Sequence, residues 1–193
     1  TVLIDFHTHS TASDGALDPI TLVQRAADRG IDAFAITDHD TVAGYRLARS
    51  RFVGGEGVPA LVPGVELSCR WSGTTIHVVG LGMDIDHPAL VAGLCRLDKA
   101  RLERGGKIAE RLARRGMPGA LEGALAVAGD SQLGRPHFAQ WMVAQGHVES
   151  ANEAFDRYLG QGKIGDVKAF WPELAEATGW IVDSGGVAIV AHP

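Results

Sequence analysis

Histidine and carboxylate residues recur in this sequence at the ends of short apolar runs, a pattern that suits metal-ion chemistry. The run from Val2 to Phe6 predicts a buried strand, and His7 and His9 follow where turn residues begin. Because side chains alternate along a strand, the two imidazoles are expected to point the same way. Together with Asp14, they form a plausible half-site for a transition metal.

Residues of the same kind lie at or beside the later predicted strands: Asp38, His39, Glu66, His77 and His192. A charged Glu or a His inside an apolar segment costs free energy to bury unless it is paired or coordinates an ion. Nitrogen and oxygen ligands suit Mn, Fe or Zn, and a glutamate can bridge two ions with its two oxygens. Together these residues therefore indicate a site for several metal ions.

The elements that would position these side chains alternate between strands and helices. Asp18 and Pro19 open a helix that ends at Gly30, because an acidic N-cap and a proline favour the first turn. The expected strands lie at residues 2–6, 32–37, 60–62, 64–68, 74–81, 164–167 and 186–191. Polar residues at the carboxyl ends of such strands are typical of parallel barrels and doubly wound sheets.

Residues 89–160 differ in texture and predict helices with short breaks. The charged stretch 101–115 keeps Ile108 and Leu112 on one face, and we interpret its charges as a solvated helix surface rather than a nucleic-acid contact. Three more helices are expected at 118–128, 136–145 and 151–159, and a final one at 172–183. The predicted organisation is therefore one α/β domain, residues 1–88 and 161–193, that carries a helical insertion at 89–160.

Composition and charge limit the function further. With 193 residues and 46% apolar content the chain can bury a core, and its net charge of -5 offers no basic face for long nucleic acid. Cys69 and Cys95 have neither a zinc-knuckle nor a disulfide spacing, so we expect them reduced in a cytoplasmic protein. No apolar stretch predicts a membrane span or a signal peptide. Because position 1 is Thr, we expect that at least an initiator Met is missing.

Six segments in order resemble the motifs of one family: HTHSTASDG, ITDHDT, GVELS, HVVGLG, GRPHFA and VAIVAHP. The sequence resembles the PHP (polymerase and histidinol phosphatase) metal-dependent phosphoesterases of the amidohydrolase superfamily over nearly its whole length. The helical insertion and the GRPH segment resemble the bacterial branch that acts on nucleoside 3',5'-bisphosphates.

The resemblance implies a distorted (β/α)7 TIM-like barrel of the PHP type with two to three divalent ions, Mn2+ first and Fe or Zn as alternatives. His7 and His9 would bind the first ion, Glu66 would bridge it to a second ion on His77 and His192, and Asp14 and His39 would hold the third. The family also has a later Asp-x-His pair that this sequence lacks. We therefore expect a fragment without the last barrel elements.

The expected reaction is hydrolysis of the 3'-phosphate of a nucleoside 3',5'-bisphosphate by metal-activated hydroxide, which leaves the 5'-monophosphate. Asp38, beside the ligand His39, is predicted to orient that imidazole, with proton transfer as the alternative. Arg135 and His137 at a helix N-terminus, and less strongly Lys163, are candidate phosphate binders on an insertion that could act as a lid. The four tryptophans could stack on a base, although packing is the favoured use of each.

Three alternatives stay open at this point. The same ions could support a 5'-3' exoribonuclease on short RNA, although the negative net charge of the chain counts against it. They could also support hydrolysis of histidinol phosphate. A PHP domain can also be a non-catalytic structural module, but loss of ligands is the signature of that class and the ligand positions within this chain are filled. The expected partner is a small phosphorylated nucleotide rather than a membrane or a long nucleic acid.

Overall fold

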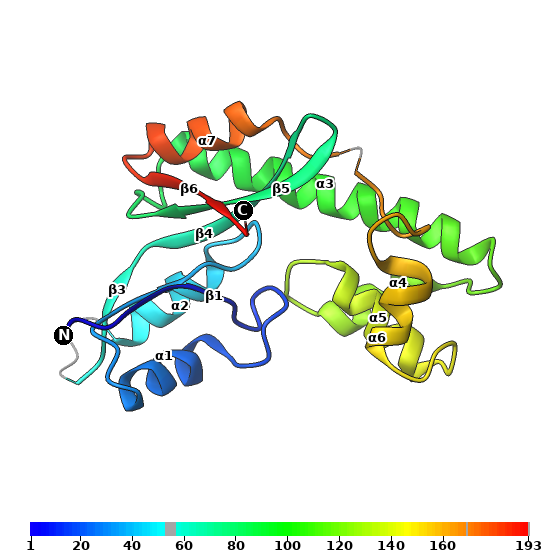
Figure 1. Ribbon diagram of the computed structural model, residues 1–193, viewed down its shortest axis with the longest axis horizontal. Coiled ribbons are helices and arrows are strands. Elements are labelled where there is room, and N and C mark those ends of the chain that lie inside the picture. Colours follow the sequence, from blue (N-terminus) through cyan, green and yellow to red (C-terminus); the bar gives the residue numbers. More distant parts are fainter. Residues whose placement is uncertain (53–56, 169, 193) are drawn as a thin grey trace. The chain divides into compact units, whose positions relative to one another are not determined.

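The computed structural model describes residues 1–52, 57–168 and 170–192. The chain divides into two compact units, which are described separately below. Thr1–Leu97 with Trp171–Pro193 form the sheet unit, and Asp98–Phe170 form the helical unit. The sheet unit contains both strands and helices, so the prediction of a mixed α/β fold is confirmed (Figure 1).

The first sheet of the sheet unit is parallel and has the order β1-β2-β3. Its strands are β1 (Ile4–Thr8), β2 (Ala33–Ile36) and β3 (Ala60–Val62). Two helices, α1 (Pro19–Asp28) and α2 (Ala43–Phe52), connect these strands and pack against β2. Their shared core consists of Val23, Ala26, Phe34, Ile36 and Ala48. This core joins both helices to the middle strand of the sheet.

Helix α1 begins as its sequence predicts. The Asp18 carboxylate accepts hydrogen bonds from the backbone N–H groups of Ile20 and Thr21, and Pro19 occupies the first helical position. The cap satisfies two amide donors that have no partner within the helix. Gly30 follows the helix with φ 69°, in the left-handed region that glycine adopts at little cost. The chain can therefore turn directly into β2.

The second sheet is antiparallel and has the order β4-β5-β6. Its strands are β4 (Gly64–Trp71), β5 (Thr74–Leu81) and β6 (Val187–Ala191), and α7 (Leu174–Asp183) packs against all three. Ser72 and Gly73 join β4 to β5 with φ values of 49° and 76°. A two-residue turn with positive φ matches the twist of the paired strands and fixes their register. Ser68 on β4 therefore lies opposite His77 on β5.

The two sheets meet where the chain leaves β2. Asp40 N–H donates to Glu66 O at 2.9 Å, and Glu66 N–H donates to Asp38 O at 3.1 Å. This short parallel pairing places residues 38–40 beside the middle of β4. Across the described residues, the strands form two three-stranded sheets and not a closed barrel.

The helical unit is built from the later part of α3 (Pro88–Ala113) together with α4 (Ala120–Ala128), α5 (Arg135–Ala144), α6 (Ala151–Ala154) and one turn of π-helix, η1 (Phe155–Leu159). Its most deeply buried side chains include Ile108, Leu112, Phe138, Met142 and Leu159. Ile108 and Leu112 are the apolar pair expected within the charged stretch. The face of α3 that carries these two residues therefore packs into this core.

The expectation that the charged side chains of residues 101–115 form a solvated helix surface is wrong in part. Arg101 and Arg104 are buried, and their guanidinium groups donate to Leu133 O and Val167 O at 2.9 and 2.7 Å. Arg111 donates to Ile164 O at 2.8 Å. Long arginine side chains can cross a helix surface and satisfy backbone carbonyls that have no other partner.

The predicted strand at 164–167 is also wrong, for the same physical reason. Its carbonyl groups accept hydrogen bonds from arginine side chains, and its amide groups take part in turns. Gly165 N–H donates to Tyr158 O at 2.7 Å, and the Asp166 carboxylate accepts from Gly162 N–H at 2.8 Å. With its backbone groups satisfied locally, this segment forms turns instead of joining a sheet.

Among the described residues, no helix combines the length and the apolar character that crossing a membrane requires.

Candidate metal centre

The carboxylate of Glu66 lies at the centre of the site and is fully buried. Five histidine side chains surround it. Its Oε2 is 3.0 Å from His7 Nε2, 3.0 Å from His9 Nε2 and 3.5 Å from His39 Nδ1. Its Oε1 is 3.2 Å from His77 Nδ1 and 3.4 Å from His192 Nε2. The structure thus brings together side chains from five separate segments of the sequence.

The sheets explain this convergence. His7 lies in β1 and His9 just after it, His39 follows β2, and His77 and Glu66 lie in paired strands of the second sheet. His192 follows β6 with φ 50°, a left-handed conformation that is uncommon for a residue with a side chain. Such backbone strain concentrates at functional sites.

Asp14 forms the outer side of the cluster. Its Oδ1 is 3.6 Å from His9 Nδ1, and its Oδ2 is 3.7 Å from His39 Nε2. Within each of three groups of residues, the potential ligand atoms lie within 4.8 Å of one another. The groups are His7, His9 and Glu66; His9, Asp14 and His39; and His39, Glu66 and His77. The first group equals the set expected for the first ion. The other two differ from expectation, because His9 joins Asp14 and His39, and because His39 rather than His192 lies with Glu66 and His77.

The spacing of these atoms fits metal ligands. Two ligand atoms about 2.1 Å from one ion lie about 3.0 Å apart at a right angle and about 3.4 Å apart at the tetrahedral angle. Most of the distances from Glu66 to the histidines lie in that interval. Moreover, His9 Nδ1 and Glu66 Oε1 are buried and form no well-oriented hydrogen bond to the described residues. Buried polar atoms of this kind need a partner, and a divalent cation suits this donor set.

The electrostatics of the metal-free site favour a cation there. Burial alone would raise the pKa of the Glu66 carboxyl, but the contacts with His77 and His9 and the nearby His39 outweigh it and hold that pKa far below its usual range. For His9, burial would lower the pKa, whereas the contact with Glu66 and the charge of Asp14 raise it. Glu66 is therefore ionised, and the site attracts positive charge.

The carboxylate of Asp38 is buried and fixes the loop that carries His9 and Asp14. Its Oδ1 accepts from Ser10 N–H and from Ser13 Oγ–H at 2.7 Å each, and its Oδ2 accepts from Ser10 Oγ–H at 2.6 Å. Burial is the main cause that raises the pKa of Asp38, and the serine hydrogen bonds oppose it. These contacts make Asp38 a positioning residue for the histidine loop. The predicted orientation of the His39 imidazole by Asp38 stays a prediction.

Sequence reasoning missed the partners of Asp38. Gly44 in α2 is one of them, because a Cβ there would lie 2.1 Å from Asp38 Oδ2 and 2.7 Å from Ser10 Oγ. Asp40, likewise buried, accepts from Ser68 N–H at 2.6 Å and ties β4 to the segment that follows β2. The serines of HTHSTAS were a visible signal, since Ser commonly bonds to nearby backbone and carboxylate groups in turns.

The three candidate phosphate binders belong to the helical unit. Arg135 is the first residue of α5, and its Nη1 donates to Leu159 O at 2.9 Å. His137 is buried, and its Nδ1 accepts from Gly134 N–H at 3.0 Å, so this nitrogen caps the helix. Lys163 lies exposed in a turn.

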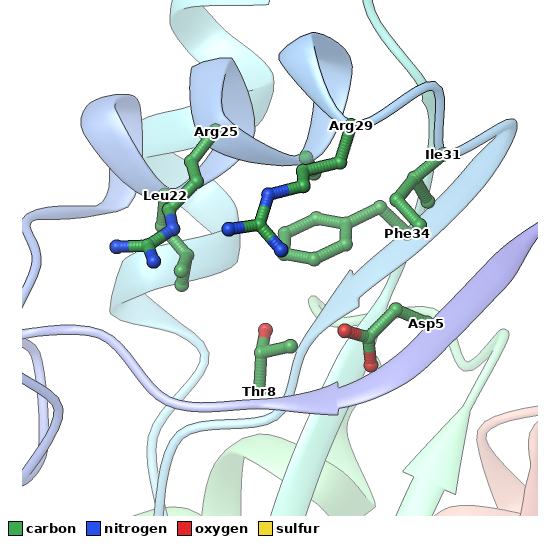
Figure 2. A pocket seen from close by; sticks show the side chains of 8 residues that line it. Asp5, Thr8, Leu22, Arg25, Arg29, Ile31 and Phe34 are labelled. Atoms are coloured by element: carbon green, nitrogen blue, oxygen red, sulfur yellow. The ribbon is translucent and has the colours of Figure 1, made fainter.

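A separate cavity of about 370 Å3 lies between β1 and α1, where Arg25 and Arg29 extend from the helix toward the strand residues Asp5 and Thr8 (Figure 2). Phe34 forms part of its apolar wall. Since none of the clustered histidines lines it, this cavity is not part of the metal centre.

Comparisons with known proteins agree with the motifs. The family model described as "PHP domain" matches residues 5–80. A 5'-3' exoribonuclease of Haemophilus influenzae is 44% identical over 191 residues, which cover 98% of this chain and 68% of that protein. The chain belongs to the PHP family. Its resemblance to that family, inferred from the six segments, is thereby confirmed.

Two further relatives come from Chromobacterium violaceum. A 3',5'-nucleoside bisphosphate phosphatase is 41% identical over 191 residues, which cover 98% of this chain and 66% of that protein. An amidohydrolase solved with bound sulfate and no metal has a TM-score of 0.87 and 40% identity, over 98% of this chain and 66% of that one. The chain thus spans about two thirds of the length of the relatives it matches.

Proposed function

We propose that this PHP protein is a metal-dependent phosphatase that hydrolyses the 3'-phosphate of nucleoside 3',5'-bisphosphates. The observation that carries the proposal is the convergence of five histidines on one buried carboxylate, with Asp14 beside them. A cluster with this many nitrogen and oxygen donors is suited to the multinuclear hydrolysis of phosphate esters.

The resemblance to the family implies three ligand sets, and the distances support them. His7, His9 and Glu66 would hold one ion, Glu66 with His77 and His192 a second, and Asp14 with His39 a third, with Mn2+ as the preferred metal. When bound, such ions activate water for attack on phosphorus and offset the negative charge of the ester and of the departing oxygen.

The remaining contributions come from the protein. Asp38 keeps His9 and Asp14 in place through Ser10 and Ser13, which preserves the spacing of the ligands. Arg135, His137 and Lys163 would bind the second phosphate of the substrate, and the insertion at 89–160 would act as a lid over the domain formed by 1–88 and 161–193. A planar guanidinium suits a phosphate because it can donate two parallel hydrogen bonds.

A 5'-3' exoribonuclease is the second candidate, because relatives with that name reach 43–44% identity. The two activities break the same kind of bond. In a nucleoside 3',5'-bisphosphate and at the first linkage of a 5'-phosphorylated RNA, water attacks the phosphorus on the 3' oxygen and a 5'-monophosphate leaves. The candidates therefore differ in what lies beyond that phosphorus rather than in the reaction.

Fold and location complete the proposal. The two sheets would form part of a distorted (β/α)7 barrel, since residues 38–40 already pair with β4 across the boundary between them. A cytoplasmic protein agrees with two free cysteines among the described residues, Cys69 and Cys95.

The test is phosphate release by the full-length, Mn-loaded protein from adenosine 3',5'-bisphosphate, with AMP, histidinol phosphate and a 5'-phosphorylated oligoribonucleotide in parallel. We expect the bisphosphate to be preferred over AMP by about 100-fold, which corresponds to about 2.7 kcal/mol at the transition state. Glu66→Gln should abolish turnover. The control Glu110→Gln, which changes an exposed ion pair with Lys107, should not. No turnover with bound metal confirmed would favour the non-catalytic module instead.

A further inference from the structure

The single turn of π-helix in the helical unit, η1, contacts two of the candidate phosphate binders, Arg135 and Lys163. We propose that η1 orients the Arg135 guanidinium toward the second phosphate of the substrate, and that Phe155, the first residue of the turn, is a positioning residue for it. This inference rests on the proposed function, because it concerns how a proposed phosphate binder is held. Turns of π-helix are rare and occur frequently at functional sites.

The turn closes through a hydrogen bond of the π type. Gly160 N–H donates to Phe155 O at 2.8 Å, five residues back along the chain. A side chain is disfavoured at this point, because a Cβ on Gly160 would lie 2.7 Å from Phe155 O. Gly160 is also extended, with ψ 179°, so the helix ends before it. The carbonyl of Leu159, the last residue of η1, is therefore left to accept from a donor outside the helix.

Arg135 supplies that donor. Its Nη1 donates to Leu159 O at 2.9 Å, and its guanidinium carbon lies over the Phe155 ring, 5.9 Å from the centroid. A cation within about 6 Å of the centroid of an aromatic ring is attracted by the ring. The turn thus contacts the guanidinium at two points, through a backbone carbonyl and through an aromatic side chain.

These contacts leave one edge of the guanidinium open. Among the described residues, neither Nε nor Nη2 of Arg135 has a hydrogen-bond acceptor. Burial lowers the pKa of this group, and the negative charge of Asp166 opposes that shift. A cation that is partly removed from water is stabilised by an added negative charge, and the edge formed by Nε and Nη2 matches two oxygens of a phosphate. The open edge therefore suits a phosphate.

Lys163 lies at the same end of the turn. Its N–H donates to Gly160 O at 3.1 Å, and its Cγ would lie 4.0 Å from a Cβ on Gly160. Arg135 and Lys163 are thus both anchored where η1 ends. Free carbonyl groups at the end of a helix repel an anion, but Phe155 O and Leu159 O both accept hydrogen bonds here. The end of η1 is therefore compatible with a bound phosphate.

Tyr158 offers a comparison within the same turn. Its ring also has an arginine over it, because the guanidinium carbon of Arg157 lies 5.1 Å from the centroid. That arginine is exposed and forms an ion pair with Glu153 at 2.5 Å, whereas the open edge belongs to Arg135. Both Phe155 and Tyr158 are partly buried against the core of the helical unit. Loss of either ring should therefore affect packing similarly, but only loss of Phe155 should affect the second phosphate.

The test compares Phe155→Leu, Phe155→Tyr and the control Tyr158→Leu in the full-length, Mn-loaded protein. Adenosine 3',5'-bisphosphate carries both phosphates, whereas adenosine 3'-monophosphate lacks the one that Arg135 would bind. We expect Phe155→Leu to raise KM for the bisphosphate about 5-fold, with kcat little changed and KM for the monophosphate unchanged. Phe155→Tyr keeps the ring and should retain the wild-type KM, and Tyr158→Leu should raise neither KM. Gly160→Ala disturbs the turn without removing a core side chain and should show the same difference between substrates as Phe155→Leu.

A binding measurement separates this inference from the proposed reaction. With a chelator present, calorimetric titration of the full-length protein with AMP and with adenosine measures the contribution of the 5'-phosphate without turnover. AMP should bind more tightly than adenosine, and Phe155→Leu should reduce the ratio of the two affinities about 5-fold even if neither substrate is hydrolysed. Equal KM changes for the two substrates, a Phe155→Tyr variant that behaves like Phe155→Leu, or an affinity ratio unchanged in Phe155→Leu and in Gly160→Ala would each overturn the proposal.

Discussion

Replacing Asp38 with Asn tests whether this buried carboxylate positions the metal ligands. The substitution keeps the shape of the side chain but converts one oxygen into an NH2 group. Asn can still accept the bonds from Ser10 N–H and Ser13 Oγ–H, both at 2.7 Å in the native protein. The third bond, from Ser10 Oγ–H at 2.6 Å, loses its acceptor, because Nδ2 can only donate.

The expected cost follows from that single buried donor. A buried hydroxyl without an acceptor costs about 1–3 kcal/mol, and hydrogen bonds to a charged group are stronger than those to a neutral amide. We therefore expect Asp38→Asn to lower the free energy of unfolding of the metal-free protein by about 2 kcal/mol. Since Ser10 and Ser13 are the first and last residues of the segment between His9 and Asp14, metal affinity should also fall by about 10- to 100-fold.

Two measurements check this expectation. Urea unfolding in the presence of a chelator gives the change in the free energy of unfolding, and titration with Mn2+ gives the change in affinity. If Asp38→Asn unfolded like the wild type and bound Mn2+ equally well, the positioning role would be refuted. Loss of one limb of the pH–rate profile with unchanged metal binding would instead indicate that Asp38 transfers a proton.

Three further predictions concern the same site. Gly44→Ala should destabilise the protein by about 2–4 kcal/mol in urea unfolding, because its Cβ would lie 2.1 Å from Asp38 Oδ2. The control Gly106→Ala in α3, where a Cβ would meet nothing within 4 Å, should stabilise the protein by about 0.5–1 kcal/mol. The pKa of His9 is raised above its usual 6.5, so its contribution to the stability of the metal-free protein is complete below pH 6.5 and is lost as the pH rises through the raised pKa. The Tm measured with a chelator should therefore fall as the pH rises. The added Tm from Mn2+ should show the opposite trend, since metal binding requires neutral imidazoles, and a parallel fall would contradict this reasoning. Glu66→Gln should reduce the metal content of the purified protein, measured by elemental analysis, by more than half, and an unchanged content would remove Glu66 from the ligand set.

The local sequence was sufficient to predict elements that depend on short-range interactions. α1 follows from Asp18, Pro19 and its apolar stripe, and β2, β5 and β6 follow from continuous apolar runs. The strand expected at 164–167 failed because its carbonyl groups are satisfied by Arg104 and Arg111 from a distant helix. Interactions of this kind depend on which segments meet, and a single segment carries no record of them.

The sequence by itself determined the chemical type of the site. Histidines and carboxylates at strand ends predicted a metal centre, since burying such groups without a partner is costly. Only the tertiary structure decided how they are arranged: Glu66 became the centre because the segment at 38–40 pairs with β4 and aligns the ends of two sheets. The contacts of Asp38 with Ser10 and Ser13 likewise depend on packing between distant segments. Residue type fixes which atoms can bind a cation, but the distances between these atoms arise from backbone pairing between segments far apart in the chain.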